Sequence, residues 1–362
     1  MPRLATLAAA AASAAVAAAA LAVGATLLRR RRRRERVRLL PKIEFHAHLH
    51  GSIRRSTLRA LADERGLGAK ARAVLGGPRD LPTCFAIFGL VHACVDSLDV
   101  VARVCEETLE DFAAEGCAYV ELRSTPRALG GATVAAYVER VAAAMESWDD
   151  AKLTPRFLVS VDRSRGSDAA RATVDAVLRL RETSPIVRKY VVGVDFSGNP
   201  TSSDGFGSYE ALFRRCRAAG LGLALHCGEV AREDDDGARI LAIAAEDPAR
   251  CRLGHALHFR DDDLADARSL VEVCPSSNAC TLGLASLADH PRLKAALRGA
   301  RGPPISLCTD DTAVFDTNLT DEWLKVMDAF GCDLADLAYA QADAATFAFD
   351  RAACTAALQR SG

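Results

Sequence analysis

Three of the eight histidines in this chain of 362 residues stand within five positions of one another. His46 and His48 are separated by one residue inside the apolar run Ile43–Leu49, and His50 follows it. Runs of this kind form β-strands, and side chains two positions apart on a strand point to the same side. Both imidazoles can therefore face one site. Because imidazole nitrogens are common ligands of Zn²⁺, the pattern predicts the beginning of a metal site.

A His-x-His pair alone is more often a pair of hydrogen-bonded strand histidines, so the metal reading needs further ligands. Two later apolar runs supply them, because His226 ends one and Asp310 and Asp311 end another. Nitrogen and oxygen ligands of this kind suit Zn²⁺ and other divalent ions. Three histidines and one carboxylate, with a position left for water, are typical of a catalytic metal site. The residue types therefore indicate metal-assisted chemistry.

Eight short apolar runs are the candidate strands that would position these ligands. They are Ile43–Leu49, Tyr119–Thr125, Phe157–Val161, Val191–Phe196, Leu221–His226, Cys251–Leu257, Leu270–Cys274 and Ile305–Thr309. Segments with helical spacing separate most of them, which predicts a parallel sheet. Eight repeats favour an α/β fold of the (β/α)8 TIM barrel type over an open doubly wound sheet. About 70 residues separate the first two runs, so we expect extra helices inserted after the first strand.

Polar clusters stand at the end of nearly every run. They are His46–His50, Arg123–Arg127, Asp162–Arg163, Ser197–Asn199, His226–Glu229, His255, Ser276–Asn278 and Thr309–Thr312. In a (β/α)8 barrel all strands end on one face, and that face carries the active site. The clusters therefore predict an enzyme, with its site assembled from several strand ends.

The charge of the chain is unevenly distributed. Residues 1–38 hold nine Arg and one Glu, and removing them from the totals of 46 basic and 47 acidic residues leaves 37 and 46. A body with a net charge near −9 excludes a nucleic-acid-binding surface. Twelve scattered cysteines without a C-x-x-C pair indicate reduced thiols. We expect one domain over residues 39–362, acting as a monomer.

The segment before this domain has a composition of its own. Residues 4–28 carry no charge and are followed by the six arginines Arg29–Arg34. At about 1.5 Å per residue a helix of this length can cross a bilayer, although its many alanines make it a marginal span. The basic block would then leave the body in the cytoplasm. We therefore expect a cytoplasmic catalytic domain with membrane contact through residues 4–28, and the alternative is an organelle-targeting peptide.

Five motifs, in this order, make the chain similar to a known family. They are Pro41–Ser52, with the sequence PKIEFHAHLHGS, then His226–Glu229, Leu253–His255, Val273–Asn278 and Thr309–Asp311. Together they resemble the adenosine deaminase family, whose fold is a metal-dependent (β/α)8 barrel. Within it, Tyr119–Arg127, Val161–Arg163 and Asp195–Pro200 are most similar to the branch of N6-methyl-AMP deaminases. The resemblance implies hydrolysis at C6 of a purine nucleotide, with N6-methyl-AMP giving IMP and methylamine.

The resemblance also implies roles for individual residues. One Zn²⁺ would be held by His46, His48, His226 and Asp310. Glu229 corresponds to the catalytic proton donor, while His255 and Asp311 correspond to groups that orient the attacking water or contact the purine. The positions that match substrate contacts are His48, His50, His92, Ser124, Thr125, Pro126, Arg127, Asp162, Gly198 and Asp311. A guanidinium forks onto phosphate oxygens, so Arg127 is a candidate phosphate ligand, with a rim salt bridge as the alternative.

Two residues depart from the family pattern and bear on the substrate. His50 stands where the family has Asp or Asn, and Ala256 follows His255 where Gly is usual. One alternative is therefore an adenosine or adenine deaminase that needs no phosphate, and another is a barrel that binds nucleosides without catalysis. The cytidine-type zinc deaminases are excluded, because their H-x-E and P-C-x-x-C signatures are absent from the sequence.

Overall fold

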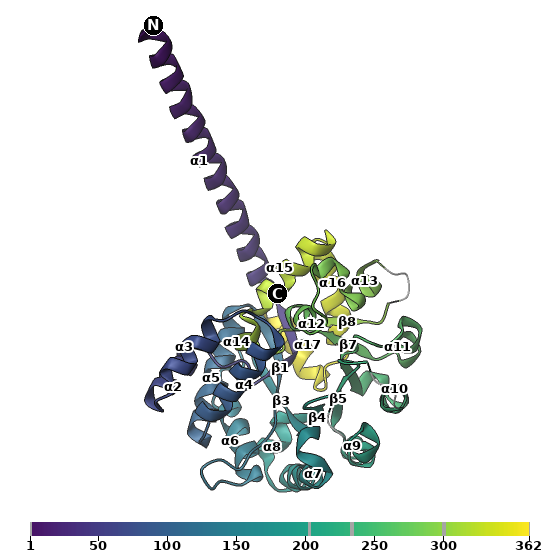
Figure 1. Cartoon of the computed structure of the whole chain (residues 1–362). Coiled ribbons are helices and arrows are strands. Elements are labelled where there is room, and N and C mark those ends of the chain that lie inside the picture. The colour runs from purple at the N-terminus through teal and green to yellow at the C-terminus, as the bar shows by residue number, and fades with distance from the viewer. Residues whose placement is uncertain (1, 202–203, 232–234, 299–301, 362) are drawn as a thin grey trace. The chain divides into compact units, whose positions relative to one another are not determined.

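The computed structural model describes residues 2–201, 204–231, 235–298 and 302–361. The chain divides into two compact units, residues 1–40 and residues 41–362. The first unit is the single helix α1 (Pro2–Leu39) (Figure 1), rich in alanine and leucine, which have high helix propensity. Among the described helices, none has the length and apolarity that crossing a membrane requires.

Eight parallel strands form one sheet in sequence order within the second unit. They are β1 (Lys42–His48), β2 (Cys117–Ser124), β3 (Thr154–Asp162), β4 (Val191–Ser197), β5 (Gly222–Cys227), β6 (Cys251–His255), β7 (Leu270–Val273) and β8 (Ile305–Leu307). Beyond β8, the Asp310 amide donates to the His46 carbonyl at 2.8 Å and the His48 amide donates to the Asp310 carbonyl at 3.0 Å. These bonds join the two edges of the sheet, so the predicted barrel is confirmed, with all eight strands.

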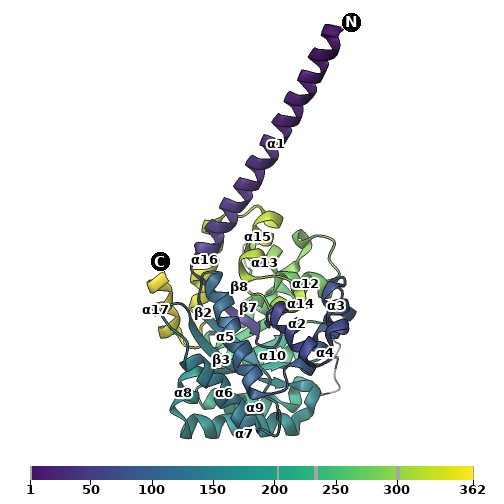
Figure 2. The same ribbon diagram turned by 90° about the vertical axis from the view of Figure 1, so that its left-hand side faces the viewer.

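Helices surround the strands, as Figures 1 and 2 show. The segment between β1 and β2 holds α2 (Arg55–Glu64), α3 (Gly68–Gly76), α4 (Leu81–Cys94) and α5 (Leu98–Ala114), which confirms the predicted insertion. The later helices are α6 (Val134–Glu146), α7 (Gly166–Thr183), α8 (Pro185–Tyr190), α9 (Glu210–Ala218), α10 (Asp236–Glu246), α11 (Asp261–Ala267), α12 (Pro275–Leu282), α13 (Pro291–Arg298), α14 (Thr312–Phe315), α15 (Leu319–Phe330), α16 (Leu334–Ala345) and α17 (Arg351–Ser361). Short 3₁₀ turns occupy Arg163–Arg165, Phe206–Ser208, Pro248–Arg250 and Leu287–Asp289.

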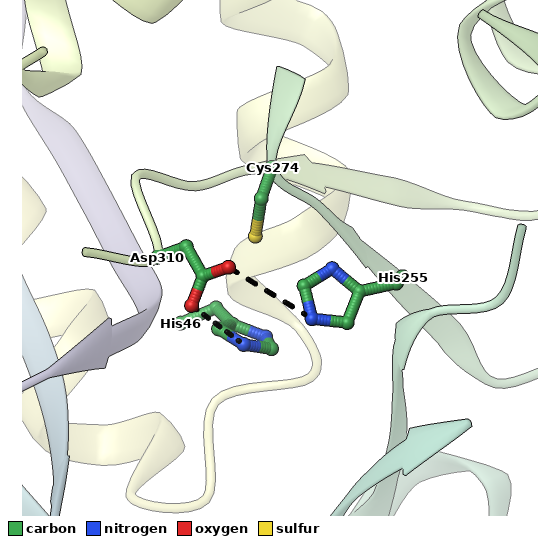
Figure 3. A group of neighbouring side chains, drawn as sticks. All are labelled: His46, His255, Cys274 and Asp310. Carbon is green, nitrogen blue, oxygen red and sulfur yellow. Dashed lines mark ion pairs between the residues drawn. The ribbon is translucent and has the colours of Figure 1, made fainter. Parts of the chain in front are cut away.

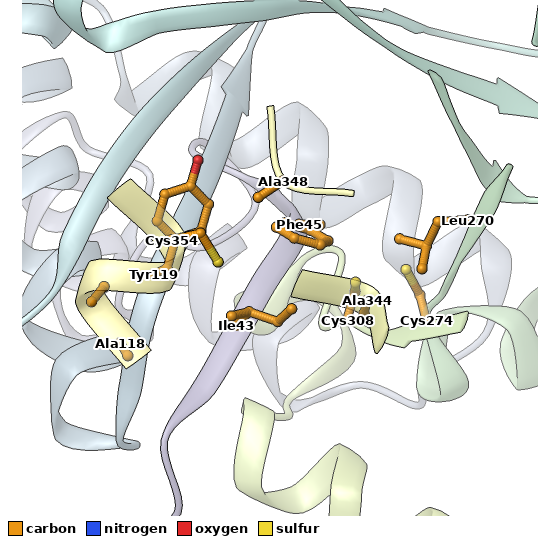
Figure 4. Close-up of a cluster of buried hydrophobic side chains, with 11 residues drawn as sticks. Ile43, Phe45, Ala118, Tyr119, Leu270, Cys274, Cys308, Ala344, Ala348 and Cys354 are labelled. Atoms are coloured by element: carbon orange, nitrogen blue, oxygen red, sulfur yellow. The ribbon is translucent and has the colours of Figure 1, made fainter. Parts of the chain in front are cut away.

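The C-terminal segment completes the core. One buried apolar cluster joins β1, β2, β7 and Cys308, which follows β8, to Ala344, Ala348 and Cys354 (Figure 4). A second cluster places Phe349 against Leu158 and Ala224 of the barrel strands. Apolar burial is therefore shared between the strands and a segment that follows all eight of them in the chain. All twelve cysteines are free, and most of them are buried.

Two glycines make room for Phe349 at the barrel strands. A Cβ atom on Gly222 would lie 2.2 Å from Phe349 Cγ, and one on Gly193 would lie 2.7 Å from Phe349 Cδ2. Overpacking of a core typically costs about 1–3 kcal/mol. We expect Gly222→Ala to lower the free energy of unfolding by at least that amount, as measured by urea denaturation.

The matched control is Gly89→Ala in α4. No heavy atom lies within 4 Å of a Cβ built at Gly89, so this change should raise helix propensity and stability. Equal stabilities for Gly222→Ala and the unaltered chain would show that Phe349 does not occupy the position described.

Candidate metal and catalytic site

The His-x-His pair lies where the first strand departs from regular pairing. The register of β1 against β2 shifts between Glu44 and Ala47, and such bulges redirect side chains next to active sites. The rings of His46 and His48 lie with centroids 5.3 Å apart. The Nδ1 atom of His46 contacts Glu272 Oε2 at 2.7 Å, so its Nε2 atom is the one turned to the site.

His226, on β5, is oriented in the same way from the other side of the barrel. Its Nδ1 atom lies 2.9 Å from Asp195 Oδ1 on β4, and its Nε2 atom lies 3.1 Å from Nε2 of His48. A carboxylate behind an imidazole fixes its orientation and increases its basicity as a ligand. His46 and His226 therefore each have the carboxylate support that is typical of metal ligands.

One buried arginine joins the two supporting carboxylates. Arg123 Nη1 donates to Asp195 Oδ1 at 2.9 Å and Nη2 donates to Glu272 Oε2 at 2.7 Å. All three side chains have no exposed surface. Buried charges of this kind persist only when they are paired and hydrogen-bonded. Arg123 thus holds Asp195 and, together with Arg252, whose Nε donates to Glu272 Oε1 at 2.7 Å, it holds Glu272 behind His46.

The carboxylate of Asp310 completes the cluster. Its Oδ1 atom lies 3.6 Å from His46 Nε2 and 3.4 Å from His48 Nε2. Asp310 has a φ of 62°, a conformation that is rare for residues other than glycine and is found at functional sites. The buried His46 Nε2 has no hydrogen-bond partner among the described residues. An unsatisfied nitrogen facing other ligand atoms is what a divalent ion would satisfy, so the site fits the metal that the sequence predicts.

Burial and neighbouring charges determine the protonation of the three histidines His46, His48 and His226. Burial, opposed only in part by Asp310, lowers the pKa of His48 to about 3, and burial together with Arg123 lowers the pKa of His46 well below its usual value. Burial acts in the same direction on His226, but the Asp195 carboxylate outweighs it and raises the pKa of that histidine. Neutral imidazoles offer a lone pair to a metal. His46 and His48 are therefore in the ligating form at neutral pH.

His255 lies beside this cluster, and its neighbour Asn278 determines which ring nitrogen carries the proton. Asn278 accepts from the Cys274 amide at 3.2 Å through Oδ1, so its Nδ2 atom is a donor, and that atom lies 2.8 Å from His255 Nδ1. The proton of a neutral His255 is then on Nε2, 4.0 Å from carboxylate oxygens of Glu229 and Asp310. A nitrogen that carries a proton donates hydrogen bonds and does not ligate a metal. His255 is therefore placed to hold an oxygen beside the ligands.

His290 contacts Asn278 and through it supports the orientation of His255. His290 is buried, accepts from the Leu293 amide at 3.3 Å through Nδ1, and places Nε2 3.1 Å from Asn278 Oδ1. His290 and Asn278 were not among the predicted site residues. The sequence signal for Asn278 is its place in the polar cluster after β7, whereas the sequence gives no signal for His290.

Cys274 is a further neighbour, which was predicted only as the end of a strand and not as a ligand. Ligand atoms of His46, His255, Cys274 and Asp310 lie within 4.8 Å of one another (Figure 3). Burial, with additional repulsion from Asp310, raises the pKa of the Cys274 thiol well above its usual value. A protonated thiol is a poor ligand, since metals bind the thiolate. The histidine and aspartate set is therefore the better donor set.

Two carboxylates face the same region without complete hydrogen bonding. Glu229 Oε1 and Asp311 Oδ1 are buried and have no partner among the described residues. Burial and the neighbouring Asp310 raise the pKa of Asp311 well above its usual value. A Cβ atom on Gly51 would lie 1.6 Å from Asp311 Oδ1, so the absence of a side chain at Gly51 gives that oxygen its room. Unpaired buried oxygens of this kind are available to a ligand.

A cluster around His50 lies at the ends of β1 and β2. Tyr137 Oη lies 3.0 Å from His50 Nε2 and 2.6 Å from Ser124 Oγ. Arg127 Nη2 lies 3.4 Å from His50 Nδ1, and the ring of His92 lies 6.1 Å from that of His50. Tyr137 was not predicted, because its position on the buried face of α6 looks like an ordinary core residue in the sequence.

The remaining predicted contacts occupy the same end of the barrel. Thr125 and Pro126 follow β2, and the Pro126 carbonyl accepts from Arg165 at 2.9 Å. Asp162 ends β3 and accepts from the Ser164 amide at 2.9 Å. Gly198, with a φ of 94°, follows β4, and a Cβ atom there would lie 2.0 Å from Asp162 Oδ1. The structure therefore brings Asp162 and Gly198 together.

Ala256 is buried and has a φ of 51°, in the left-handed region. Its amide donates to the carbonyls of Cys227 at 3.0 Å and Gly254 at 2.8 Å, which fixes this conformation. An L-residue pays about 1–2 kcal/mol there, whereas glycine does not. We expect Ala256→Gly to raise the free energy of unfolding by about 1 kcal/mol, as measured by urea denaturation.

Ala356, exposed within α17, provides a control of opposite sign. Glycine in a helix interior costs about 1 kcal/mol, so Ala356→Gly should be less stable than the unaltered chain. A loss of stability in both variants would contradict the strain assigned to Ala256.

Comparison with known proteins gives matches over most of the chain. A family model described as adenosine deaminase matches residues 41–360. A protein of Arabidopsis thaliana named N6-mAMP deaminase is 34% identical over 355 residues, which cover 87% of this chain and 95% of that protein. The N6-methyl-AMP deaminase of Danio rerio is 34% identical over 312 residues, covering 81% and 86%. The crystal structure of Arabidopsis ADAL complexed with IMP matches with a TM-score of 0.77 at 30% identity, covering 90% of this chain and 96% of that one.

Proposed function

The chain belongs to the adenosine deaminase family and is a hydrolytic deaminase, and from this premise we propose that its substrate is N6-methyl-AMP. Water replaces the methylamino group at C6 of the purine, so the products are IMP and methylamine. The relatives named N6-methyl-AMP deaminase in Arabidopsis and zebrafish support this substrate, as does the IMP complex of the Arabidopsis protein.

The observation that carries the proposal is the cluster around Arg127. Among the described residues, no carboxylate lies within ion-pair distance of its guanidinium, whose side-chain bonds go to the Val95 carbonyl at 3.2 Å and to His50. Arg127 Nε is buried without a partner among these residues. Unpaired guanidinium groups bind phosphate oxygens well, through charge-assisted hydrogen bonds. Arg127, with His50 and His92 beside it, therefore supports a substrate that carries a phosphate.

We propose that one Zn²⁺ is held by His46, His48, His226 and Asp310. When bound, the ion supplies Lewis acidity that lowers the pKa of water at the site. His46 and His226 are oriented for it by Glu272 and Asp195. The unpaired Nε2 atom of His46 supports this donor set.

The neighbouring residues have distinct roles in this proposal. Glu229 delivers a proton to N1 of the purine as the oxygen nucleophile adds to C6. His255 donates from Nε2 and orients that oxygen, and Asp311 contacts the purine ring. Gly198 brings the chain backbone close to the ring, where a side chain would collide with Asp162. Thr125, Pro126 and Ser124 line the side toward the nucleotide, and Ser124 acts through Tyr137 on His50.

Removing the guanidinium tests the phosphate contact. A hydrogen bond to a charged group is worth about 1.5–3 kcal/mol, so Arg127→Gln should lower kcat/KM for N6-methyl-AMP by about 10- to 100-fold. The value for N6-methyladenosine should change less than about twofold, because that compound has no phosphate. Turnover is followed by purine absorbance.

Arg215→Gln on the outside of α9 is the control, since that guanidinium pairs with Asp175 at 2.8 Å. It should leave kcat/KM for both compounds unchanged. Equal losses on both compounds in Arg127→Gln would show that Arg127 serves the structure and not the phosphate. Turnover of adenosine in place of N6-methyl-AMP would overturn the proposed substrate and retain the reaction.

We also propose that residues 39–362 form the catalytic domain, which acts as a monomer on the cytoplasmic side, and that residues 1–38 serve attachment or targeting. The uncharged stretch 4–28 beside Arg29–Arg34 supports this division. Membrane contact of that stretch stays a prediction.

A further inference from the structure

A cavity of about 610 Å³ opens at the opposite end of the barrel from the candidate metal site. Its walls come from residues that precede three strands: α8 before β4, Gly220 before β5, and the turn Pro248–Arg250 before β6. Part of its lining is the segment Ala348–Arg351 that follows α16. Since strands of a barrel run in one direction, residues that precede them lie on the face away from the strand ends. The cavity is therefore separate from the site described above.

The lining of this cavity is strongly basic in a body that is otherwise acidic. It contains the basic residues Arg181, Arg188, Lys189, Arg250 and Arg351, but only two carboxylates, Asp247 and Asp350. One of these carboxylates is already engaged, because Asp350 pairs with Arg156 at 2.8 Å. Lys189 is likewise engaged, by Glu146 at 2.8 Å, so the excess of positive charge in the lining comes from the arginines.

None of the four arginines in the lining has an ion pair among the described residues, and three of them donate to main-chain carbonyls. Arg188 donates to the carbonyls of Arg181 at 2.7 Å and Glu182 at 2.6 Å, at the end of α7. Arg250 donates to the Gly220 carbonyl at 2.6 Å, and Arg181 donates to the Val191 carbonyl. Each guanidinium has five N–H donors, so these bonds leave donors free on all three. Main-chain carbonyls hold the arginines in place but do not neutralise them.

The three arginines line one cavity, where the charges of Arg188 and Arg250 oppose that of Arg181. Burial lowers the pKa of Arg181, and the charges of Arg188 and Arg250 lower it further. Like charges that are gathered without a counter-charge destabilise a fold, and an anion bound among them removes that cost. Planar guanidinium forks match phosphate oxygens in particular. Val192, Ala348 and Phe349 add an apolar surface to the same cavity.

We propose that this cavity is a second anion-binding site, which takes the phosphate groups of a small phosphorylated molecule or an inorganic polyphosphate. Arg181, Arg188 and Arg250 bind the phosphate oxygens. An organic ligand would in addition place its apolar part against Val192 and Phe349. The site is independent of the substrate proposed for the other end of the barrel.

The test uses the full chain and sodium tripolyphosphate, titrated by calorimetry at constant ionic strength. We expect saturable binding that weakens at least tenfold in the double variant Arg188→Gln, Arg250→Gln. The control Arg215→Gln removes one positive charge from the outer surface and should change the affinity less than twofold. Absence of saturable binding, or equal affinity in the double variant, would overturn the proposal. The same holds if Arg127→Gln alone abolishes binding, because the anion would then occupy the other face.

A second measurement needs no variant, which matters because Arg188 also caps the end of α7. Phenylglyoxal modifies arginine side chains, and mass spectrometry reports the modified positions. Tripolyphosphate should slow the modification of Arg188 and Arg250 at least severalfold and leave that of Arg215 unchanged. Equal rates with and without the anion would contradict a site in this cavity.

Discussion

Replacing Glu229 by glutamine is expected to lower kcat by about 10²- to 10⁴-fold, the range that a positioned general acid contributes. Glutamine keeps the size of the side chain but removes the proton that the reaction needs. Glu229 Oε1 is buried without a partner among the described residues, and Oε2 lies 4.0 Å from His255 Nε2. The measurement is single-turnover and steady-state kinetics on N6-methyl-AMP, with zinc content determined on the same samples.

Zinc content separates this role from a ligand role. Glu229→Gln should bind as much zinc as the unaltered chain, whereas Asp310→Ala should lose both zinc and activity. Glu246→Gln is the matched control, because Glu246 pairs with Arg214 at 2.6 Å on the outer surface. This variant should have the zinc content and the turnover of the unaltered chain. Near-normal turnover in Glu229→Gln would show that another group supplies the proton.

Replacing Arg123 by methionine should weaken zinc binding by about 10- to 100-fold, which is the effect of removing groups that support metal ligands. The change should also cost about 3–5 kcal/mol of stability, because it leaves the buried Asp195 without its arginine partner, whereas Glu272 keeps its pair with Arg252 at 2.7 Å. Both effects follow from the position of Arg123 between Asp195 and Glu272. Competition with a chromophoric chelator measures the zinc affinity, and urea denaturation of the metal-free protein measures the stability.

The control Arg156→Met tests whether the loss of zinc affinity in Arg123→Met comes from misplaced ligands or from a general loss of stability. Arg156 is largely buried and pairs with Asp350 at 2.8 Å, but it contacts neither a proposed ligand nor its supporting carboxylate. It should lose stability and keep its zinc affinity. If Arg123→Met lost stability alone, like this control, the supporting carboxylates would not depend on Arg123 for their orientation.

The strands and the proposed ligands could be read from the sequence because their signals are local. An apolar run marks a strand, and a polar residue at its end marks the active face of a barrel. His46, His48, His226 and Asp310 each carry such a signal, and the barrel brings them together once the topology is known.

The groups that support these ligands carry no comparable signal. Arg123 meets Glu272 across 149 positions and Asp195 across 72, so no spacing in the sequence indicates either pair. His290 and Tyr137 act through one intermediate residue each, Asn278 and His50, and lie among core residues in the sequence. Contacts of this kind depend on the register and twist of strands far apart in the chain, which a local pattern does not contain.

The position of Phe349 in the core has a consequence for folding during synthesis. The two glycines that admit its ring, Gly193 and Gly222, are synthesised long before it. The Phe349 amide donates to Glu121 Oε1 at 2.8 Å, and the Phe347 carbonyl accepts from Arg252 at 3.1 Å. The buried charges of Glu121 on β2 and Arg252 on β6 therefore lack these hydrogen bonds until this segment has been synthesised. On the ribosome, all eight strands can leave the exit tunnel while the interior still lacks the Phe349 ring and these two hydrogen bonds. Nascent chains stalled before Phe347 should therefore recruit chaperones and be digested by protease, and chains long enough for α17 to have left the tunnel should resist it.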